Sequence, residues 1–299
     1  MAKTNIVFSA SSFNLWEWCE CKYNYAHIMR KTLPVDQKPE PLDRGGLGHI
    51  GMEVYFNQLA TGVHYNDRMH NAIMKIKAAA SDATFSNIDM TEELPILTSN
   101  FTQSCEHWRF EDEHLEILAV ETPFDYVIFE DEWIRIIISG KIDLMVNKKG
   151  HGGEASYTNL PYDHKFVTRD FPVDRTDNQF INYAHAVSSN YIIVNKVGMQ
   201  KTLKPEEKYK RIPLSYDPLF IDQWKENVIR VVIDKYLPAR LRNHYPMRFS
   251  NCRKFGRLCE FHPVCNSSGE DAKKWKLESQ YIDREPWDKY AEEGEEGAI

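Results

Sequence analysis

The sequence predicts an α/β fold in which helices cover a mixed central sheet. The first third of the chain shows helical periodicity, and the middle is a run of strand-like segments rich in β-branched and aromatic residues. A helix, a further strand and a long amphipathic helix then follow. This order is typical of a sheet with helices packed on its faces. A hydrophobic fraction of 42% in 299 residues is enough for a sizeable buried core.

The first 110 residues are predicted to be mostly helical. The serines at 11–12 can cap a helix that runs to about Met29, with apolar side chains at helical spacing. A polar, proline-rich loop follows, and a glycine pair then opens a second helix over residues 45–59. Further helices are expected near residues 66–80 and 92–110.

The middle of the chain is predicted to form the sheet. Residues 114–129 and 133–146 are typical of two strands joined by a tight acidic turn at residues 130–132. A polar loop comes next, and residues 160–167 form a third strand. These three segments are expected to pair as a meander.

Helices and strands alternate in the rest of the core. Residues 176–189 are predicted to be helical, with apolar side chains on one side, and residues 189–198 to form a further strand. Residues 208–216 fit another strand. A long amphipathic helix is expected over about residues 217–236.

We expect one domain over residues 1–270, followed by a tail. Its parts are N-terminal helices over residues 9–110, a catalytic core over 111–215, and a C-terminal helix with a cysteine segment over 216–268. Residues 271–299 form the tail, with a solvated acidic end at residues 292–296. No internal repeat divides the chain.

The net charge of -7 argues against a protein coated in nucleic acid, because phosphate contacts need lysine and arginine. Net charge says little about one cleft, however, and basic residues do cluster at 201–211 and 240–257. The first residues lack the charged and then apolar pattern of a secretory signal, and no run of 18 or more apolar residues occurs. We therefore expect a cytoplasmic protein that has no membrane helix.

Two carboxylates and a lysine are candidate catalytic residues. Asp163 and Lys165 are two positions apart in a predicted strand, so they project to the same face. Asp143 lies in the neighbouring predicted strand and can complete the group. Oxygen ligands of this kind suit magnesium or manganese, and a nearby lysine can polarise or deprotonate an attacking water. An Asp-x-Lys pair alone is more often a solvated strand face, so the order of the surrounding motifs matters.

Six cysteines occur, and three of them lie in one short segment. Disulfides are rare in cytosolic proteins, so grouped cysteines there indicate metal ligands or reactive thiols. Cys252, Cys259 and Cys265 need a fourth ligand from elsewhere in the chain, and their spacing is not that of a zinc knuckle. Cys105 stands alone and is expected to be a buried thiol.

Seven motifs occur in a recognisable order. They are Ser9-Ala-Ser11-x-Phe13-x-x-Trp16-x-x-Cys19-x-x-Lys22-Tyr23, Gly45-x-x-x-His49-x-x-x-Glu53, Val120-Glu121-x-x-Phe124, Gly140-Lys141-Ile142-Asp143, Asp163-His164-Lys165, Gln179-x-x-x-Tyr183 and the three C-terminal cysteines. From Ser9 to Cys265 this order resembles the RecB-like branch of the PD-(D/E)XK nuclease superfamily, especially its iron–sulfur exonucleases of CRISPR-associated and phage origin. The chain departs from that pattern at Glu20, where the family has a proline.

The resemblance implies a restriction-endonuclease-like core with a helical N-terminal part and a C-terminal iron–sulfur segment. The metal ligands that it implies, for Mg²⁺ or Mn²⁺, are His49, Asp143, Asp163 and the backbone carbonyl of His164. Lys165 would act on the nucleophilic water. Gln179 and Tyr183, four residues apart on one helix face, would position DNA or the lysine. Glu121 would either support a second metal or have a structural use.

The same resemblance makes Cys19 the fourth ligand beside Cys252, Cys259 and Cys265. Four thiolates suit a [4Fe–4S] cluster, and a four-cysteine zinc site or unliganded cysteines are the alternatives. Cys21 would point roughly 200° away from Cys19 on a helix, so only one of the two can face the cluster.

The function that follows is metal-dependent DNA cleavage, with an exonuclease acting on DNA ends or single strands as the main expectation. The resemblance implies roles in recombination, repair, phage replication or CRISPR adaptation, with a helicase, recombination or adaptation protein as partner. Two alternatives stay open. One is a catalytically silent DNA-binding or scaffold subunit, and the other is an iron–sulfur redox sensor.

Overall fold

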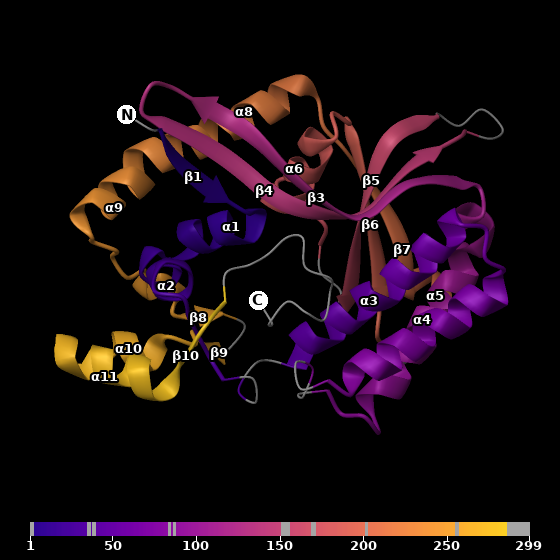
Figure 1. The fold of residues 1–299 in the computed structure, drawn as a ribbon, viewed down its shortest axis with the longest axis horizontal. Coiled ribbons are helices and arrows are strands. Elements are labelled where there is room, and N and C mark those ends of the chain that lie inside the picture. Colours follow the sequence, from indigo (N-terminus) through magenta and orange to yellow (C-terminus); the bar gives the residue numbers. More distant parts are fainter. Residues whose placement is uncertain are drawn as a thin grey trace.

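In the part of the chain that the structure describes, a six-stranded mixed sheet forms the centre, with helices on both of its faces (Figure 1). The computed structural model describes residues 3–34, 37, 40–82, 85, 88–150, 156–168, 172–200, 203–254 and 257–285. The strands of this sheet are β1 (Thr4–Phe8), β3 (Leu115–Glu130), β4 (Ile134–Lys148), β5 (Tyr157–Val167), β6 (Tyr191–Gly198) and β7 (Tyr209–Ser215). The α/β class and the mixed sheet expected from the sequence are confirmed.

The strand order creates a fork beside β4. The hydrogen-bonded order is β1-β4-β5-β6-β7, and β3 also pairs with β4. Along one edge β4 pairs with β1 through residues 134–138 and with β5 from Leu144 onward, while antiparallel β3 follows the opposite edge. On that edge, residues 139–143 lie between the pairing with β1 and the pairing with β5. This gap between the two partner strands is the fork. This stretch contains the Gly-Lys-Ile-Asp motif.

Two apolar layers sandwich the sheet. On one face pack the long helices α3 (Glu40–Ala60), α4 (Tyr65–Ala80) and α5 (Glu93–Asp112), which share a core with the inner side chains of β5. The helices of the other layer are α1 (Ala10–Trp18), α6 (Asn178–Ala186), α8 (Pro218–Val231), η4 (Val232–Tyr236) and α9 (Leu237–Arg242). The short helix α7 (Pro205–Lys208) precedes β7. No helix among the described residues is long and apolar enough to cross a membrane.

The first 30 residues differ from the single helix that the sequence predicts. Residues 4–8 form β1, and the cap of α1 is Ser9, whose Oγ accepts a hydrogen bond from the Ser12 amide at 3.1 Å. The helix ends at Cys19, whose φ of -164° and ψ of 112° are extended. The chain resumes as α2 (Glu20–Tyr23) and the π-helix η1 (Asn24–Ile28). The prediction was wrong here because pairing of β1 with β4 and docking of α1 are long-range contacts.

A small C-terminal module pairs with the N-terminal segment. Strand β2 (Lys31–Thr32) pairs with β10 (Ile282–Asp283), and β8 (Arg253–Lys254) pairs with β9 (Arg257–Leu258). The short helices η5 (Phe249–Asn251) and α10 (His262–Cys265) and the longer α11 (Glu270–Gln280) complete it. Part of the expected tail therefore forms α11 and β10. Residues 286–299, with the acidic end, lie outside the described residues.

Candidate metal centre and active site

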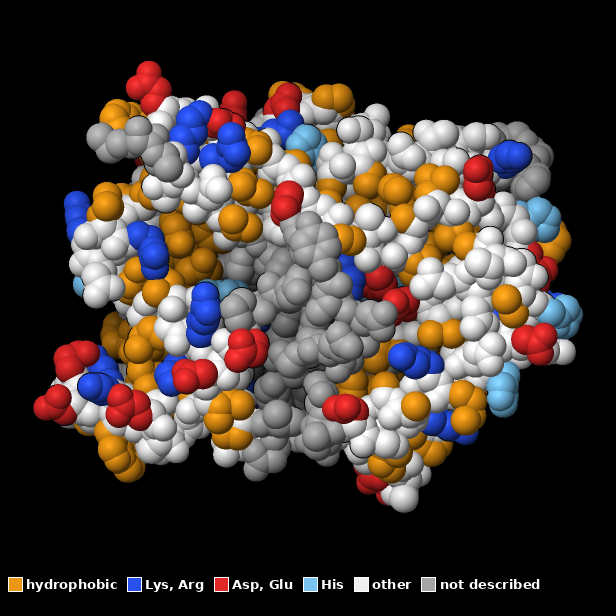
Figure 2. Space-filling model, in the orientation of Figure 1, with side chains coloured by type: hydrophobic (Ala, Val, Ile, Leu, Met, Phe, Trp, Pro, Cys, Tyr) orange, Lys and Arg blue, Asp and Glu red, His pale blue; other side chains and the backbone are white. Residues whose placement is uncertain are grey.

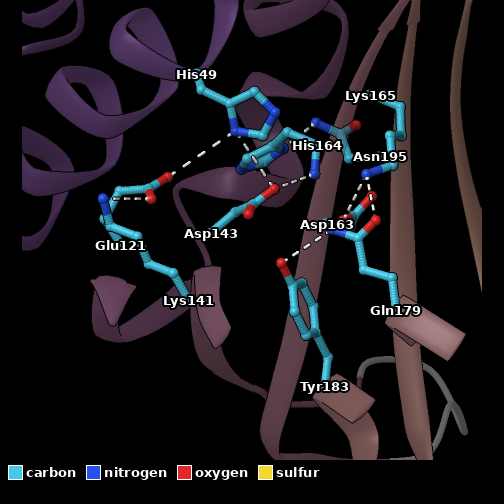
Figure 3. Close-up of polar contacts among 10 residues, drawn as sticks. All are labelled: His49, Glu121, Lys141, Asp143, Asp163, His164, Lys165, Gln179, Tyr183 and Asn195. Carbon is cyan, nitrogen blue, oxygen red and sulfur yellow. Dashed lines mark hydrogen bonds and ion pairs between the residues drawn. The ribbon is translucent and has the colours of Figure 1, made fainter. Parts of the chain in front are cut away.

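A cavity of about 750 Å³ opens at the fork of the sheet, where β4 passes from β1 to β5. Its lining includes His49 from α3, Glu121 from β3, Asp143 from β4 and Lys165 from β5. Side chains from one helix and three consecutive strands thus meet at one place. Figure 3 shows these side chains pointing toward one another.

His49, Glu121 and Asp143 form a group that can hold a metal ion. One ligand atom from each lies within 4.8 Å of the others. The Nδ1 atom of His49 is 3.5 Å from Asp143 Oδ2 and 4.0 Å from Glu121 Oε1. The same nitrogen is buried and has no hydrogen-bond partner among the described residues. One imidazole and two carboxylates with this spacing are a suitable ligand set for a divalent cation.

Local backbone geometry positions this group. Glu121 has a positive φ of 48°, an uncommon conformation for a residue with a side chain, and it lies opposite Asp143 between the register pairs on either side. At Gly140 an added Cβ would lie 2.4 Å from the ring of Phe124. Only glycine lets that ring lie against β4, so the glycine of the Gly-Lys-Ile-Asp motif has a packing reason.

A second group of side chains forms a hydrogen-bonded chain beside the first. Lys165 Nζ donates to Asp163 Oδ1 at 2.9 Å and to Gln179 Oε1 at 3.0 Å, and Gln179 Nε2 donates to the Tyr183 hydroxyl at 3.0 Å (Figure 3). Helix α6 presents Gln179 and Tyr183 on one face, as their four-residue spacing predicts. The second oxygen of Asp163 is buried and lacks a partner among the described residues.

Burial changes the protonation of these groups. Desolvation raises the pKa of Asp143 and of Asp163 to about 6 each, even though the Lys165 ammonium lowers both. Desolvation alone would lower the pKa of Lys165, but the carboxylates of Asp163 and Asp143 raise it instead. Lys165 is therefore protonated at neutral pH. Its positive charge compensates the two buried carboxylates only in part, because burial still raises their pKa values.

His164 has a positioning role in this structure. Its backbone N–H donates to Asp143 Oδ2 at 2.6 Å, so the Asp143 side chain takes up a backbone donor of β5 beside the fork. The imidazole lies on the opposite face of the sheet, stacked on Phe56 and 2.9 Å from Asn195 Nδ2. Burial lowers the pKa of this ring well below its ordinary value. The use of the His164 carbonyl as a metal ligand stays a prediction.

Sequence reasoning did not assign a role to Lys141 or Asn195. Lys141 Nζ lies 3.5 Å from Glu121 Oε2 and lines the cavity, and Asn195 contacts His164 from β6. Lys141 has a sequence signal, because it is two positions before Asp143 and so projects to the same face. Asn195 has none, because its partner is decided by the parallel pairing of β5 with β6.

Four cysteines line a second, small hollow. They are Cys19, Cys252, Cys259 and Cys265. Cys21 does not line it, although its sulfur lies 3.8 Å from the Cys265 sulfur in the apolar core of the module. Among the described residues, no three cysteine sulfurs lie within 4.8 Å of one another. Cys105 is buried in the α3–α5 layer, as expected.

Comparison with known proteins gives one extensive match. The sequence model of the PD-(D/E)XK nuclease superfamily matches residues 7–266. Among curated proteins, no sequence matches the chain. Two solved structures are weakly similar. One, described as a candidate exonuclease from Eubacterium rectale, is 10% identical, with 88% of this chain and 94% of that chain covered and a TM-score of 0.46. The other, SSO0001, is 12% identical, with 55% and 70% covered and a TM-score of 0.28.

Proposed function

The chain belongs to the PD-(D/E)XK nuclease superfamily, and from this premise we propose that it is a metal-dependent nuclease that hydrolyses the phosphodiester backbone of DNA. The observation that carries the proposal is the meeting of His49, Glu121 and Asp143 beside Lys165 in one cavity. A silent scaffold would not need three metal-ligand side chains held this close, two of them carboxylates. The catalytic unit that we propose is a single domain, which the sequence predicts as residues 1–270 and which β10 extends by pairing with β2.

We assign the cation to His49, Glu121 and Asp143, with Asp163 and the His164 carbonyl as further ligands. The buried, unpartnered atoms His49 Nδ1 and Asp163 Oδ2 support this assignment, because buried polar atoms without partners are costly unless something binds them. Oxygen-rich sites favour Mg²⁺ or Mn²⁺. When bound, such an ion activates water and stabilises negative charge on the phosphate.

Lys165 acts in this proposal as a fixed cation. Its raised pKa keeps it protonated, so it donates hydrogen bonds to the attacking water or to a phosphate oxygen. Gln179 holds Lys165 from the side of α6, and Tyr183 in turn orients Gln179. Lys141 holds Glu121 in the same way from β4.

We further propose that the substrate is a DNA end or a single strand. A cavity of about 750 Å³ is in the range of pockets for small ligands, so it suits a few nucleotides of one strand better than intact duplex. The motif order resembles RecB-like exonucleases of recombination, repair, phage replication and CRISPR adaptation. A helicase or another protein of those processes is the partner that this resemblance implies.

The cysteine hollow is the proposed site of a [4Fe–4S] cluster with a structural role. Tetrahedral zinc with bonds of about 2.3 Å needs sulfurs about 3.8 Å apart. No three of the described cysteine sulfurs lie within 4.8 Å of one another, so they are not gathered around one zinc ion, and the choice of a cluster rests on the resemblance of the cysteine pattern. A cluster there would link α1 to the C-terminal module across the chain.

The test uses end-labelled linear DNA and covalently closed circular DNA, with Mn²⁺ or with EDTA. We expect linear DNA to be degraded only with the ion, closed circles to be spared, and Lys165→Ala to lose cleavage. Asp234→Asn, a change at an exposed residue of η4, is the control and should cleave normally. Full cleavage by Lys165→Ala would contradict its role. Nicking of closed circles would identify an endonuclease, and inactivity of the wild type would favour a binding or redox protein.

A further inference from the structure

We propose that Arg284 forms a second phosphate subsite, on the wall of the catalytic cavity contributed by the C-terminal module. The inference rests on the proposed nuclease function, because it assigns the ligand as another phosphodiester of the strand that is cleaved. Arg284 lines the same cavity as His49, Asp143 and Lys165. It is separated from all of them by more than 100 residues of sequence.

The guanidinium of Arg284 has no carboxylate partner among the described residues. It is half-buried, and no ion pair or side-chain hydrogen bond joins it to a neighbour there. Burial lowers its pKa, and the negative charge of Glu260 opposes this only in part. Arginine has five hydrogen-bond donors. When its guanidinium is partly desolvated and has no anionic partner, it favours the binding of an anion. A phosphate suits its planar fork.

The backbone around Arg284 is held in place. Its N–H donates to the Arg30 carbonyl at 2.6 Å, and the preceding Asp283 pairs with Lys31 through both the β2–β10 register and a 2.6 Å ion pair. Arg30 has a positive φ of 53°, an uncommon conformation that this contact helps to maintain. Arg284 therefore follows a strand pair that joins the N-terminal and C-terminal segments, and Figure 1 shows β10 of this pair close to α11.

Other groups of the same cavity suit a phosphate. His27 lines the same cavity and stacks on Tyr23 with ring centroids 4.9 Å apart. Its pKa is lowered to about 4, first by burial and then by the charge of Arg284. It is neutral at pH 7 and can donate one hydrogen bond. Ser9 and Ser11, at the N-terminus of α1, line the cavity as well, and this helix end carries partial positive charge.

Acidic side chains line the cavity as well, so the subsite must be local. Asp125 and Asp177 lie in the lining together with the metal ligands. On the face shown in Figure 2, acidic and basic side chains are interspersed and no broad basic area is visible. A strand would then bind through a few defined contacts. The metal centre takes the scissile phosphate, and Arg284 takes another phosphate of that strand.

The experiment measures binding of a single-stranded oligonucleotide in EDTA at several salt concentrations. Arg284→Gln should bind about tenfold more weakly, and its slope of log K against log salt should fall by about 0.7, the contribution of one neutralised phosphate. Arg284→Lys should retain most of the slope because it keeps the charge. Arg230→Gln, at an exposed position of α8, is the matched control and should behave as wild type. Equal unfolding midpoints exclude a folding defect.

Cleavage with Mn²⁺ separates this inference from the proposed function. We expect Arg284→Gln to raise KM about tenfold and leave kcat within twofold. If the wild type binds through Arg284 but cleaves nothing, the nuclease proposal fails and the subsite stands. If Arg284→Gln keeps the affinity, slope and KM of the wild type, the subsite is wrong and the nuclease proposal stands. A wild type that binds no oligonucleotide also overturns the subsite.

Discussion

Asp143→Asn is expected to stabilise the ion-free protein while it removes the metal site. Asp143 is buried, and burial outweighs the nearby cations Lys165 and Lys141, so its pKa is raised to about 6. A carboxyl group with a higher pKa in the folded state than in the unfolded state is less favourable there in its charged form. Stability is therefore lost as the pH rises from the ordinary pKa of 3.8 through about 6, and the full cost is present above that window.

The size of the effect follows from the same two values. A pKa of about 6 against 3.8 corresponds to about 3 kcal/mol. Asparagine has the same shape and keeps an oxygen that can accept from the His164 N–H, now 2.6 Å from Asp143 Oδ2. We expect Asp143→Asn to gain up to about 3 kcal/mol at pH 8 and very little at pH 4, where the aspartate is already protonated. Such a gain is a sizeable part of the stability of a typical domain.

Urea unfolding in EDTA at pH 8 and pH 4, followed by tryptophan fluorescence, measures both values. Asp234→Asn is the control, because it removes the same charge from an exposed position. Adding Mn²⁺ at pH 8 should raise the midpoint of the wild type and of the control, but not that of Asp143→Asn, because a ligand stabilises only the form that binds it. A loss of stability in Asp143→Asn at pH 8, or an equal change at both pH values, would refute the reasoning.

Two further predictions concern parts of the fold that support the site. The Arg211 side chain is 6% exposed and donates to Glu111 at 2.8 Å and to buried Asp112 at 2.5 Å. Arg211→Ala should therefore cost roughly 3–5 kcal/mol in urea unfolding, and a cost below that of the exposed control Arg230→Ala would contradict this. Cys19→Ser and Cys259→Ser should lose iron and visible absorbance in protein purified without oxygen, whereas Cys21→Ser and Cys105→Ser should keep both. Zinc without iron in the wild type would overturn the cluster assignment.

Local sequence patterns predict most of the helices and strands of the core. The change from helical to strand periodicity predicted α3 to α6 and β3 to β7 within a few residues of their bounds, because each segment needs one buried face whatever its neighbours are; the short helix α7 was not predicted. Alternation along a strand likewise predicted that Asp163 and Lys165 share a face, and they form a 2.9 Å hydrogen bond. The cysteine group could also be recognised in the sequence, because three of its members lie within 14 residues.

Tertiary structure decided which faces meet. Strand β1 and the break at Cys19 depend on pairing with β4 and on the C-terminal module, so the predicted helix register could not decide between Cys19 and Cys21. The sequence left the role of Glu121 open, and the β3–β4 register places it opposite Asp143, in the group that can hold a metal ion.

Lys141 and Arg284 show the same limit. Lys141 lies in a motif, but its contact with Glu121 depends on how two strands pair. Arg284 follows α11, and only the β2–β10 pairing brings it to a cavity whose other walls are far away in the sequence. A side chain's face follows from local backbone periodicity, which the sequence determines by itself. Its partner across the cavity follows from strand order and helix docking, which only the tertiary structure decides, because those contacts join segments that share no local periodicity.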